Sequence, residues 1–181
     1  MRDKSIHLYT LKNQVDKVKN YLNKGGEVDA FGEYNSTPLH YACREGNIEI
    51  VKLLLDFGAD IDAKNSYSTI YPIFDTLSSK KLDNTLLIIE LLIDKGADKD
   101  VVDSFGNTLL HQAIEKESME LIEYFIQLGC DVNATERHDK DTPLHYACLQ
   151  NNREMVDYLI INGADKEKLN LYNRTAESYL L

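Results

Sequence analysis

The heptapeptide Thr-Pro-Leu-His-Tyr-Ala-Cys occurs twice in this chain, at residues 37–43 and again at 142–148. An internal repeat constrains the fold more than any local pattern does, because each copy must form the same supersecondary unit. Glycines mark the period, with spacings of 33, 38, 33 and 34 residues between Gly25, Gly58, Gly96, Gly129 and Gly163. The 181-residue chain is therefore predicted to contain about five copies of one unit.

Residues 37–58 show how one unit is built. Thr37 is a good N-cap residue, because its hydroxyl can accept a hydrogen bond from a free backbone N–H group. Pro38 suits the first helical position, where no N–H donor is required. Gly58 can end a second helix in a left-handed conformation. Each unit is therefore predicted to hold two helices.

The predicted second helix carries apolar residues at helical spacing, which are Ile48, Ile50, Val51, Leu54 and Leu55. One unit cannot bury this stripe by itself, whereas stacked units bury each other's stripes. The pattern therefore favours an all-α array held together by contacts between neighbouring units.

A period near 33 residues, the TPLHxA motif and the GAD turns together make the chain similar to the ankyrin-repeat family. The resemblance extends from about Ser5 to Leu181. It implies an all-α ankyrin-repeat solenoid, with helix-turn-helix repeats, projecting β-turn or hairpin fingers, and about five repeats plus a terminal half repeat. The expected single domain, 1–181, has repeats at 1–30, 31–63, 64–101, 102–134 and 135–168, and a C-terminal half repeat at 169–181.

Repeat three departs from the pattern. TIYPIF at 69–74 stands where TPLHYA is expected, which places Pro72 at the histidine position. About six extra residues are predicted within DTLSSKKLDN at 75–84, between the two helices. This insertion is either a second contact surface or a longer loop, and loops accept insertions at small cost.

The repeated His-x-x-Cys pattern places two potential metal ligands on one helical face. However, His7, His40, His111 and His145 all occupy the same repeat position. The family resemblance implies that this imidazole forms hydrogen bonds with the threonine of its own motif and with the adjoining turn. A free cysteine often behaves as a small buried apolar residue. We therefore expect a structural role, with no metal and no cofactor.

Other sequence features narrow the function further. The chain lacks the GxSxG, Walker, GxGxxG and HExxH motifs, so we expect it not to be an enzyme. A net charge of −10 argues against nucleic acid as the main partner. Three cysteines without CxxC spacing suggest reduced thiols in the cytoplasm. No apolar run is long enough for a signal peptide or a membrane span, and we expect a monomer that does not enter a membrane.

The family resemblance also implies a concave groove that binds another protein, lined by the fingers and the exposed side of each first helix. Specificity must then lie in residues between the framework positions. The predicted fingertip residues are Phe31, Glu33, Tyr34, Ser66, Tyr67, Ser104, Phe105, Arg137 and His138. The predicted groove residues are Arg44, Glu45, Glu115, Lys116, Leu149 and Gln150.

Aromatic residues recur at one fingertip position, in Tyr34, Tyr67, Phe105 and Tyr172. They either anchor a partner, as aromatic residues often do, or pack against a neighbouring finger. Arg137 and His138 are more distinctive, since they lie in a finger with one extra residue and serve no framework role.

Three functional interpretations remain open at this point. The first is a protein-binding module that acts as an adaptor or as a blocking inhibitor. The second is a host-directed effector, or a viral or bacterial regulatory protein in the host cytosol, that uses the same surface. The third, an enzyme or a metal-binding protein, requires a site outside the framework positions.

Overall fold

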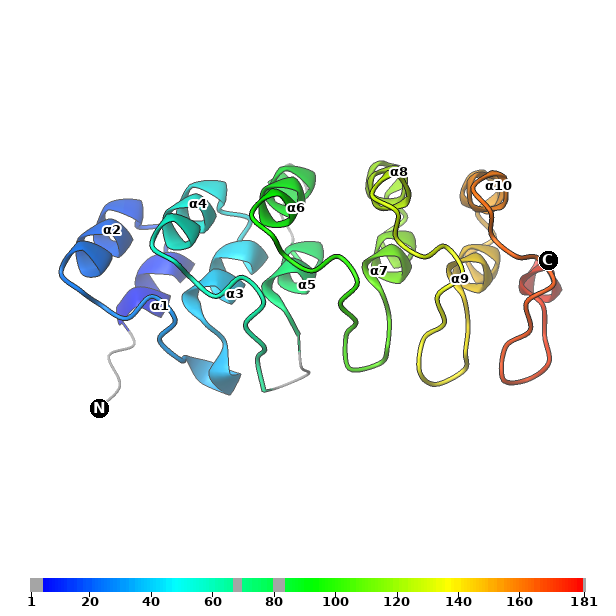
Figure 1. The fold of residues 1–181 in the computed structure, drawn as a ribbon, viewed down its shortest axis with the longest axis horizontal. Helices are drawn as coiled ribbons and strands as arrows, with labels where there is room; N and C mark the ends of the chain where they lie inside the picture. Colours follow the sequence, from blue (N-terminus) through cyan, green and yellow to red (C-terminus); the bar gives the residue numbers. More distant parts are fainter. Residues whose placement is uncertain (1–4, 67–69, 80–83, 181) are drawn as a thin grey trace. The chain divides into compact units, whose positions relative to one another are not determined.

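The computed structural model describes residues 5–66, 70–79 and 84–180. Figure 1 shows pairs of helices joined by projecting loops, and the chain divides into two compact units, 1–98 and 99–181. Among the described residues there is no β-strand, although Val102 and Thr108 form an isolated antiparallel bridge. The all-α prediction is confirmed, while the repeat boundaries stay a prediction.

The described residues of the first unit form three helix pairs. These are α1 (Ser5–Leu11) with α2 (Val15–Asn23), α3 (Pro38–Arg44) with α4 (Ile48–Asp56), and α5 (Pro72–Leu77) with α6 (Thr85–Asp94). The first helices α1, α3 and α5 pack in one row, and the second helices α2, α4 and α6 pack in another (Figure 1). A short 3-10 helix, η1 (Glu33–Asn35), lies in the loop before α3.

The second unit repeats this arrangement. Its described residues form α7 (Leu109–Glu115) with α8 (Met119–Gln127), and α9 (Pro143–Leu149) with α10 (Arg153–Ile161). The 3-10 helix η3 (Ala176–Tyr179) packs against α9, as a further first helix would.

The core of the first unit lies between the helix rows. Ile50, Val51 and Leu54 of α4 have no exposed surface, and neither do Leu39 and Ala42 of α3. The three residues of α4 belong to the apolar stripe that was predicted to face neighbouring units. Of the predicted stripe, Ile50, Val51 and Leu54 are buried as expected, whereas Ile48 and Leu55 are half-buried.

Repeat three has a different register from the one predicted. Tyr71 is the N-cap of α5 and Pro72 is its first residue, so Pro72 matches Pro38 and Phe74 takes the histidine position. The prediction that Pro72 replaces the histidine is wrong. Proline has no N–H group and a fixed φ, so the first helical position is the place that it tolerates best.

The extra residues of repeat three are also distributed differently. The first residues of α3 and α4 are ten positions apart, whereas those of α5 and α6 are thirteen apart. The start of the second helix is therefore shifted by three residues, where about six extra residues were predicted. The link contains residues 80–83, which lie outside the described residues. At its end, the Asn84 side chain donates a hydrogen bond to the Gly46 carbonyl over 3.0 Å.

Truncation of Leu54 to alanine tests whether the stacked stripe holds the first unit together. We expect Leu54→Ala to lower the free energy of unfolding by about 2–5 kcal/mol, because the cavity adds to the lost transfer free energy. Chemical denaturation measures the change. Lys52→Ala, at an exposed position of the same helix, is the control and should change stability little. Equal stability of both variants would contradict this account of the core.

Asp75 is an exception to the apolar core. It matches Tyr41 in the helix register, and its side chain is buried. Burial raises the pKa of the Asp75 carboxyl to about 6, against the opposing effect of the Arg44 charge. The folded state therefore favours the protonated carboxyl, and stability is lost as the pH rises through about 6.

Replacing Asp75 with asparagine should remove this penalty. We expect Asp75→Asn to be more stable than wild type at pH 7 by about 2–3 kcal/mol. The difference should disappear below the unfolded-state pKa of 3.8. Denaturation curves between acidic and neutral pH measure it, with Asp157→Asn on the surface of α10 as the control. A gain in stability that does not depend on pH would contradict the assignment to charge.

Candidate protein-interaction surface

The loops that precede the first helices are narrow fingers, each closed by a backbone hydrogen bond across its base. The bonds, from N–H to carbonyl, join Gly32 to Ser36 at 2.9 Å, Asp103 to Asn107 at 3.0 Å, Glu136 to Asp141 at 3.1 Å, and Asn170 to Arg174 at 3.0 Å. Because these bonds restrain the backbone, the fingertip side chains project from defined positions.

Neighbouring fingers are also bonded to each other. In the first unit the Ser66 N–H donates to the Tyr34 carbonyl, and in the second unit the Arg137 N–H donates to the Phe105 carbonyl, both over 2.7 Å. The Leu171 N–H likewise donates to the Asp139 carbonyl over 2.7 Å. Within each unit the bonded fingertips therefore form a row.

Gly106 makes one of these links possible. Its φ is +84°, and a Cβ at this position would lie 2.7 Å from the Arg137 backbone nitrogen. Any side chain would therefore both strain the backbone and obstruct the bond between Arg137 and Phe105.

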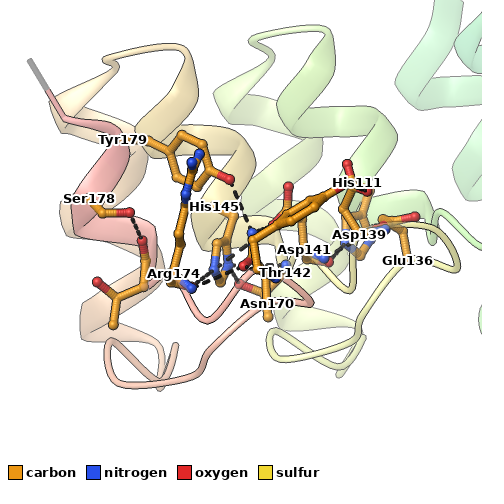
Figure 2. A network of polar contacts seen from close by, with 12 residues as sticks. His111, Glu136, Asp139, Asp141, Thr142, His145, Asn170, Arg174, Ser178 and Tyr179 are labelled. Atoms are coloured by element: carbon orange, nitrogen blue, oxygen red, sulfur yellow. Dashed lines mark hydrogen bonds and ion pairs between the residues drawn. The ribbon is translucent and has the colours of Figure 1, made fainter.

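Buried imidazoles connect the first helices α3, α7 and α9 to the finger that follows each of them. The Nδ1 atom of His145 accepts a hydrogen bond from the Thr142 N–H over 3.2 Å, so Nε2 carries the proton. That Nε2 lies 3.1 Å from the Arg174 carbonyl oxygen. Figure 2 draws both residues within the surrounding polar network. His40 and His111 form equivalent contacts with Ile70 and Asp141, at 3.0 and 3.3 Å.

Burial favours the neutral form of the His40 and His111 imidazoles. It lowers the pKa of His40, and it lowers the pKa of His111 to about 4 despite the hydrogen bond to Asp141. A neutral imidazole can accept a hydrogen bond at Nδ1 and donate one at Nε2, whereas the charged form can only donate. The described arrangement uses both functions of the neutral ring.

Glu136 organises the finger that has the extra residue. Its side chain is buried, and its carboxylate accepts hydrogen bonds from the backbone N–H groups of His138, Asp139 and Asp141. Burial opposes ionisation, but these donors outweigh it and lower the pKa of Glu136. Sequence reasoning missed this role, for which the polar residues at the equivalent repeat positions, Asp103 and Asn170, were the available signal.

The last finger is held by the amide of Asn170 (Figure 2). Its nitrogen donates to the Asp141 carboxylate over 2.7 Å and to the Tyr179 hydroxyl over 3.0 Å. Its oxygen accepts from the N–H groups of Tyr172 and Arg174. The finger is therefore tied to both the preceding finger and η3.

The first unit exposes most of its predicted fingertip residues. Tyr34 is 62% exposed and Phe31 is 44% exposed. Glu33 and Ser66 are exposed as well, while Tyr67 lies outside the described residues.

The second unit brings its predicted fingertip residues together. The rings of Phe105 and His138 lie 5.7 Å apart, and Phe105 remains 56% exposed. The exposed Arg137 donates from its guanidinium to the carbonyl of the half-buried Ser104 over 3.1 Å. Packing against a neighbour therefore accounts for only part of the Phe105 surface.

The predicted groove residues form a separate group, because they lie at the C-terminal ends of the first helices while the fingers precede the N-terminal ends. In the first unit Arg44 is exposed, with its guanidinium 4.9 Å from the Tyr41 ring centre, and Glu45 is half-buried. In the second unit Glu115, Lys116 and Leu149 are exposed and Gln150 is half-buried.

Sequence reasoning missed further exposed apolar residues in the fingers of the second unit. They are Val102, Leu169 and Leu171, which are 37%, 52% and 62% exposed. Tyr172, noted as an aromatic fingertip residue, is 59% exposed. The alternation in Leu-Asn-Leu-Tyr at 169–172 was the available signal, because it places apolar residues where no helix can bury them.

The cysteines are protonated at neutral pH. Cys43 and Cys148 are buried and Cys130 is half-buried. Burial raises the thiol pKa of Cys43 to about 12 and those of Cys130 and Cys148 to about 11. Within 5–66, 70–79 and 84–180, no three His, Cys, Asp or Glu side chains form a group suited to a metal. None of the described helices has the length and apolar character that a membrane span requires.

The pH dependence of stability tests the neutral-imidazole link. Because the folded pKa of His111 is about 4 and the unfolded value is 6.5, its contribution is complete above pH 6.5 and is lost as the pH falls toward 4. We expect His111→Gln to be less stable than wild type at pH 7 by about 2–3 kcal/mol and nearly equal at pH 4. Denaturation at several pH values measures the difference, which should be absent for exposed His138→Gln.

Comparisons with known proteins agree with this geometry. The family model "Ankyrin repeats (3 copies)" matches residues 78–170, and the model "Ankyrin repeat" matches residues 34–66. The crystal structure of the ankyrin repeat domain of Bcl-3 is similar to this chain, with a TM-score of 0.84 and 26% sequence identity. The match covers 97% of this chain and 77% of that one.

Curated relatives include enzymes. Human palmitoyltransferase ZDHHC13 is 34% identical over 94% of this chain, and palmitoyltransferase AKR1 of Lachancea kluyveri is 30% identical over 91%. The zebrafish (Danio rerio) putative palmitoyltransferase ZDHHC13 is 32% identical over 94%. The chain spans 27%, 22% and 26% of these relatives, respectively, or about a quarter of their length.

These relatives overturn one prediction. The expectation that the protein is not an enzyme is contradicted by relatives named palmitoyltransferases that match almost the whole chain. The physical reason is that the residues of this chain form a repeat scaffold, and such a scaffold reveals nothing about chemistry performed elsewhere in a protein. The cytoplasmic location and the monomeric state stay predictions.

The helix pairs, the histidine links and the bonded fingers describe one recurring unit. The family models match that same recurring unit in both halves of the chain, and the structural match covers nearly the whole chain. Ankyrin repeats form protein-interaction modules, and this chain belongs to the ankyrin-repeat family.

Proposed function

We propose that this chain binds a partner protein through its fingertip rows and the exposed ends of its first helices. One observation carries the proposal, namely that Tyr34, Phe105 and Tyr172 are each more than half exposed on fingers that are bonded to their neighbours. Large aromatic side chains on a restrained backbone are effective anchors, because little conformational entropy is lost when they are covered.

The relatives favour an adaptor over a blocking inhibitor. A palmitoyltransferase moves a palmitoyl group onto an acceptor, and an ankyrin-repeat region can hold an acceptor protein while another part of the system performs the transfer. The match of the human palmitoyltransferase ZDHHC13 to 94% of this chain supports this role. We therefore propose that the partner is an acceptor of, or a component in, palmitoyl transfer.

Alanine substitution of the fingertip aromatics tests the binding surface. Tagged chain captures partners from lysate of its source organism, and a purified partner is then titrated against wild type, Tyr34→Ala, Phe105→Ala and Tyr172→Ala. We expect at least one variant to bind about tenfold or more weakly, since an anchor contributes about 1–2 kcal/mol or more. Ile161→Ala is the matched control, because Ile161 is 82% exposed but lies on α10, away from the fingers. Unchanged affinity in all three fingertip variants would refute the surface.

An acyl-exchange measurement tests the palmitoyl-transfer role separately. Captured partners are treated with hydroxylamine, which releases thioester-linked acyl groups, and the freed thiols are labelled. We expect at least one fingertip-dependent partner to carry such a group. If specific partners are captured and none is acylated, the adaptor role in palmitoyl transfer is wrong while protein binding stands.

A further inference from the structure

The fingers of the second unit treat acidic and basic side chains differently. Residues 102–107, 135–141 and 169–175 contain four acidic side chains and three basic ones, so the formal charges nearly cancel. The basic side chains are nevertheless more exposed than the acidic ones, and this difference indicates what kind of partner the surface recognises.

Two of the four acids face inward. Asp103 is 8% exposed, and its carboxylate accepts hydrogen bonds from the N–H groups of Phe105 and Asn107, each over 2.9 Å. The Gln112 side chain donates to the same carboxylate over 3.2 Å. Glu136 is 4% exposed within the cradle of backbone N–H groups described above. The carboxylates of Asp103 and Glu136 therefore point toward N–H donors inside the protein.

The other two acids are partly covered and engaged by neighbouring side chains. The Asp139 carboxylate accepts from the Tyr172 hydroxyl over 3.1 Å, and this bond raises the pKa of Tyr172. The Asp141 carboxylate accepts from the Asn170 amide, as drawn in Figure 2. All four acids of the fingers therefore have donors within the fingers themselves or on the adjoining helix.

The basic residues, in contrast, are exposed. Arg137, Lys140 and Arg174 all project into solvent. The Arg137 guanidinium donates to a carbonyl oxygen, and that of Arg174 lies 5.9 Å from the Tyr179 ring centre. In the described part of the chain none of the three forms an ion pair with a carboxylate. Their charges remain available to another molecule.

Exposed aromatic and apolar side chains lie among these cations. Phe105, Leu171 and Tyr172 are each more than half exposed, and His138 contacts Phe105. We infer that this fingertip row recognises an acidic segment of the partner protein that also carries apolar or aromatic side chains. The inference rests on the proposed protein-binding function and adds the chemistry of the partner.

The charge of the whole chain makes this local arrangement selective. A chain of net charge −10 repels acidic partners over most of its surface. An acidic segment is therefore attracted where cations are exposed and acids are covered, and this complementarity fixes position and register more than it adds affinity.

Designed peptides test the inference. The probe is a fluorescein-labelled peptide in which glutamates alternate with phenylalanine and leucine, compared with versions carrying glutamine or lysine in place of glutamate. Fluorescence anisotropy with the wild-type chain should rank the glutamate peptide about tenfold or more above the glutamine version at low salt. The margin should shrink at high salt, because exposed charges are screened.

Reversing the charge of the basic residues in the protein tests the same inference from the other side of the interface. The double variant R137E/K140E should bind the glutamate peptide about tenfold or more weakly and should gain affinity for the lysine peptide. Arg153→Glu, an exposed cation on α10 of the same unit, is the matched control and should behave as wild type. Equal melting temperatures show that the reversed variant remains folded.

Several outcomes separate this inference from the proposed function. Equal affinity for the glutamate and glutamine peptides, or no effect of R137E/K140E, would overturn the acidic-segment inference. The proposed protein-binding function would still stand if Phe105→Ala lowers the affinity of the chain for a captured partner. Binding of phosphatidylserine vesicles or single-stranded DNA with the same dependence on Arg137 and Lys140 would also overturn it, because the surface would then recognise anions of another class.

Discussion

A pair of short helices in this chain cannot bury its own apolar stripe, and the rest of the structure depends on the neighbour that covers it. The helices of the second repeat, α3 and α4, have seven and nine residues, below the length at which isolated helices are stable in water. Ile50, Val51 and Leu54 nevertheless have no exposed surface, because α2 and α6 pack against α4. Stability therefore comes from nearest-neighbour contacts.

The same constraint explains how much of the fold could be predicted. Residues that serve stacking recur with the period, so the sequence identifies Thr37 as a helix start and the histidines as one structural position. The prediction failed at Pro72, where Thr69 and the proline gave competing signals for the helix start and the period alone could not decide between them. Glu136 occupies the same repeat position as Asp103 and Asn170, whose side-chain oxygens also accept backbone N–H groups of their own fingers. The residue type changes between glutamate, aspartate and asparagine at this position, so the identity of the repeated letters did not reveal the shared role.

The sequence predicts the candidate site only by elimination, as the residues that are left when the framework positions are removed. Removing the framework positions leaves Tyr34, Phe105 and Arg137, and the structure exposes all three. The sequence does not indicate which polar side chains turn inward, because Asp103 and Arg137 are equally polar. Their directions follow from the donors around them, since backbone N–H groups of a tight finger attract a carboxylate and offer nothing to a guanidinium.

The failed prediction about enzyme activity has a physical explanation in the same architecture. A repeat array is stabilised by contacts between its own neighbours, so it requires little from other parts of a protein in order to fold. Evolution can therefore attach such an array to a catalytic protein without placing a reacting group among the repeats. The relatives named palmitoyltransferases, which are about four times as long as the matched segment, are consistent with this arrangement. Motifs in a repeat array thus report on stacking, the residues between them report on recognition, and neither reports on chemistry performed outside the array.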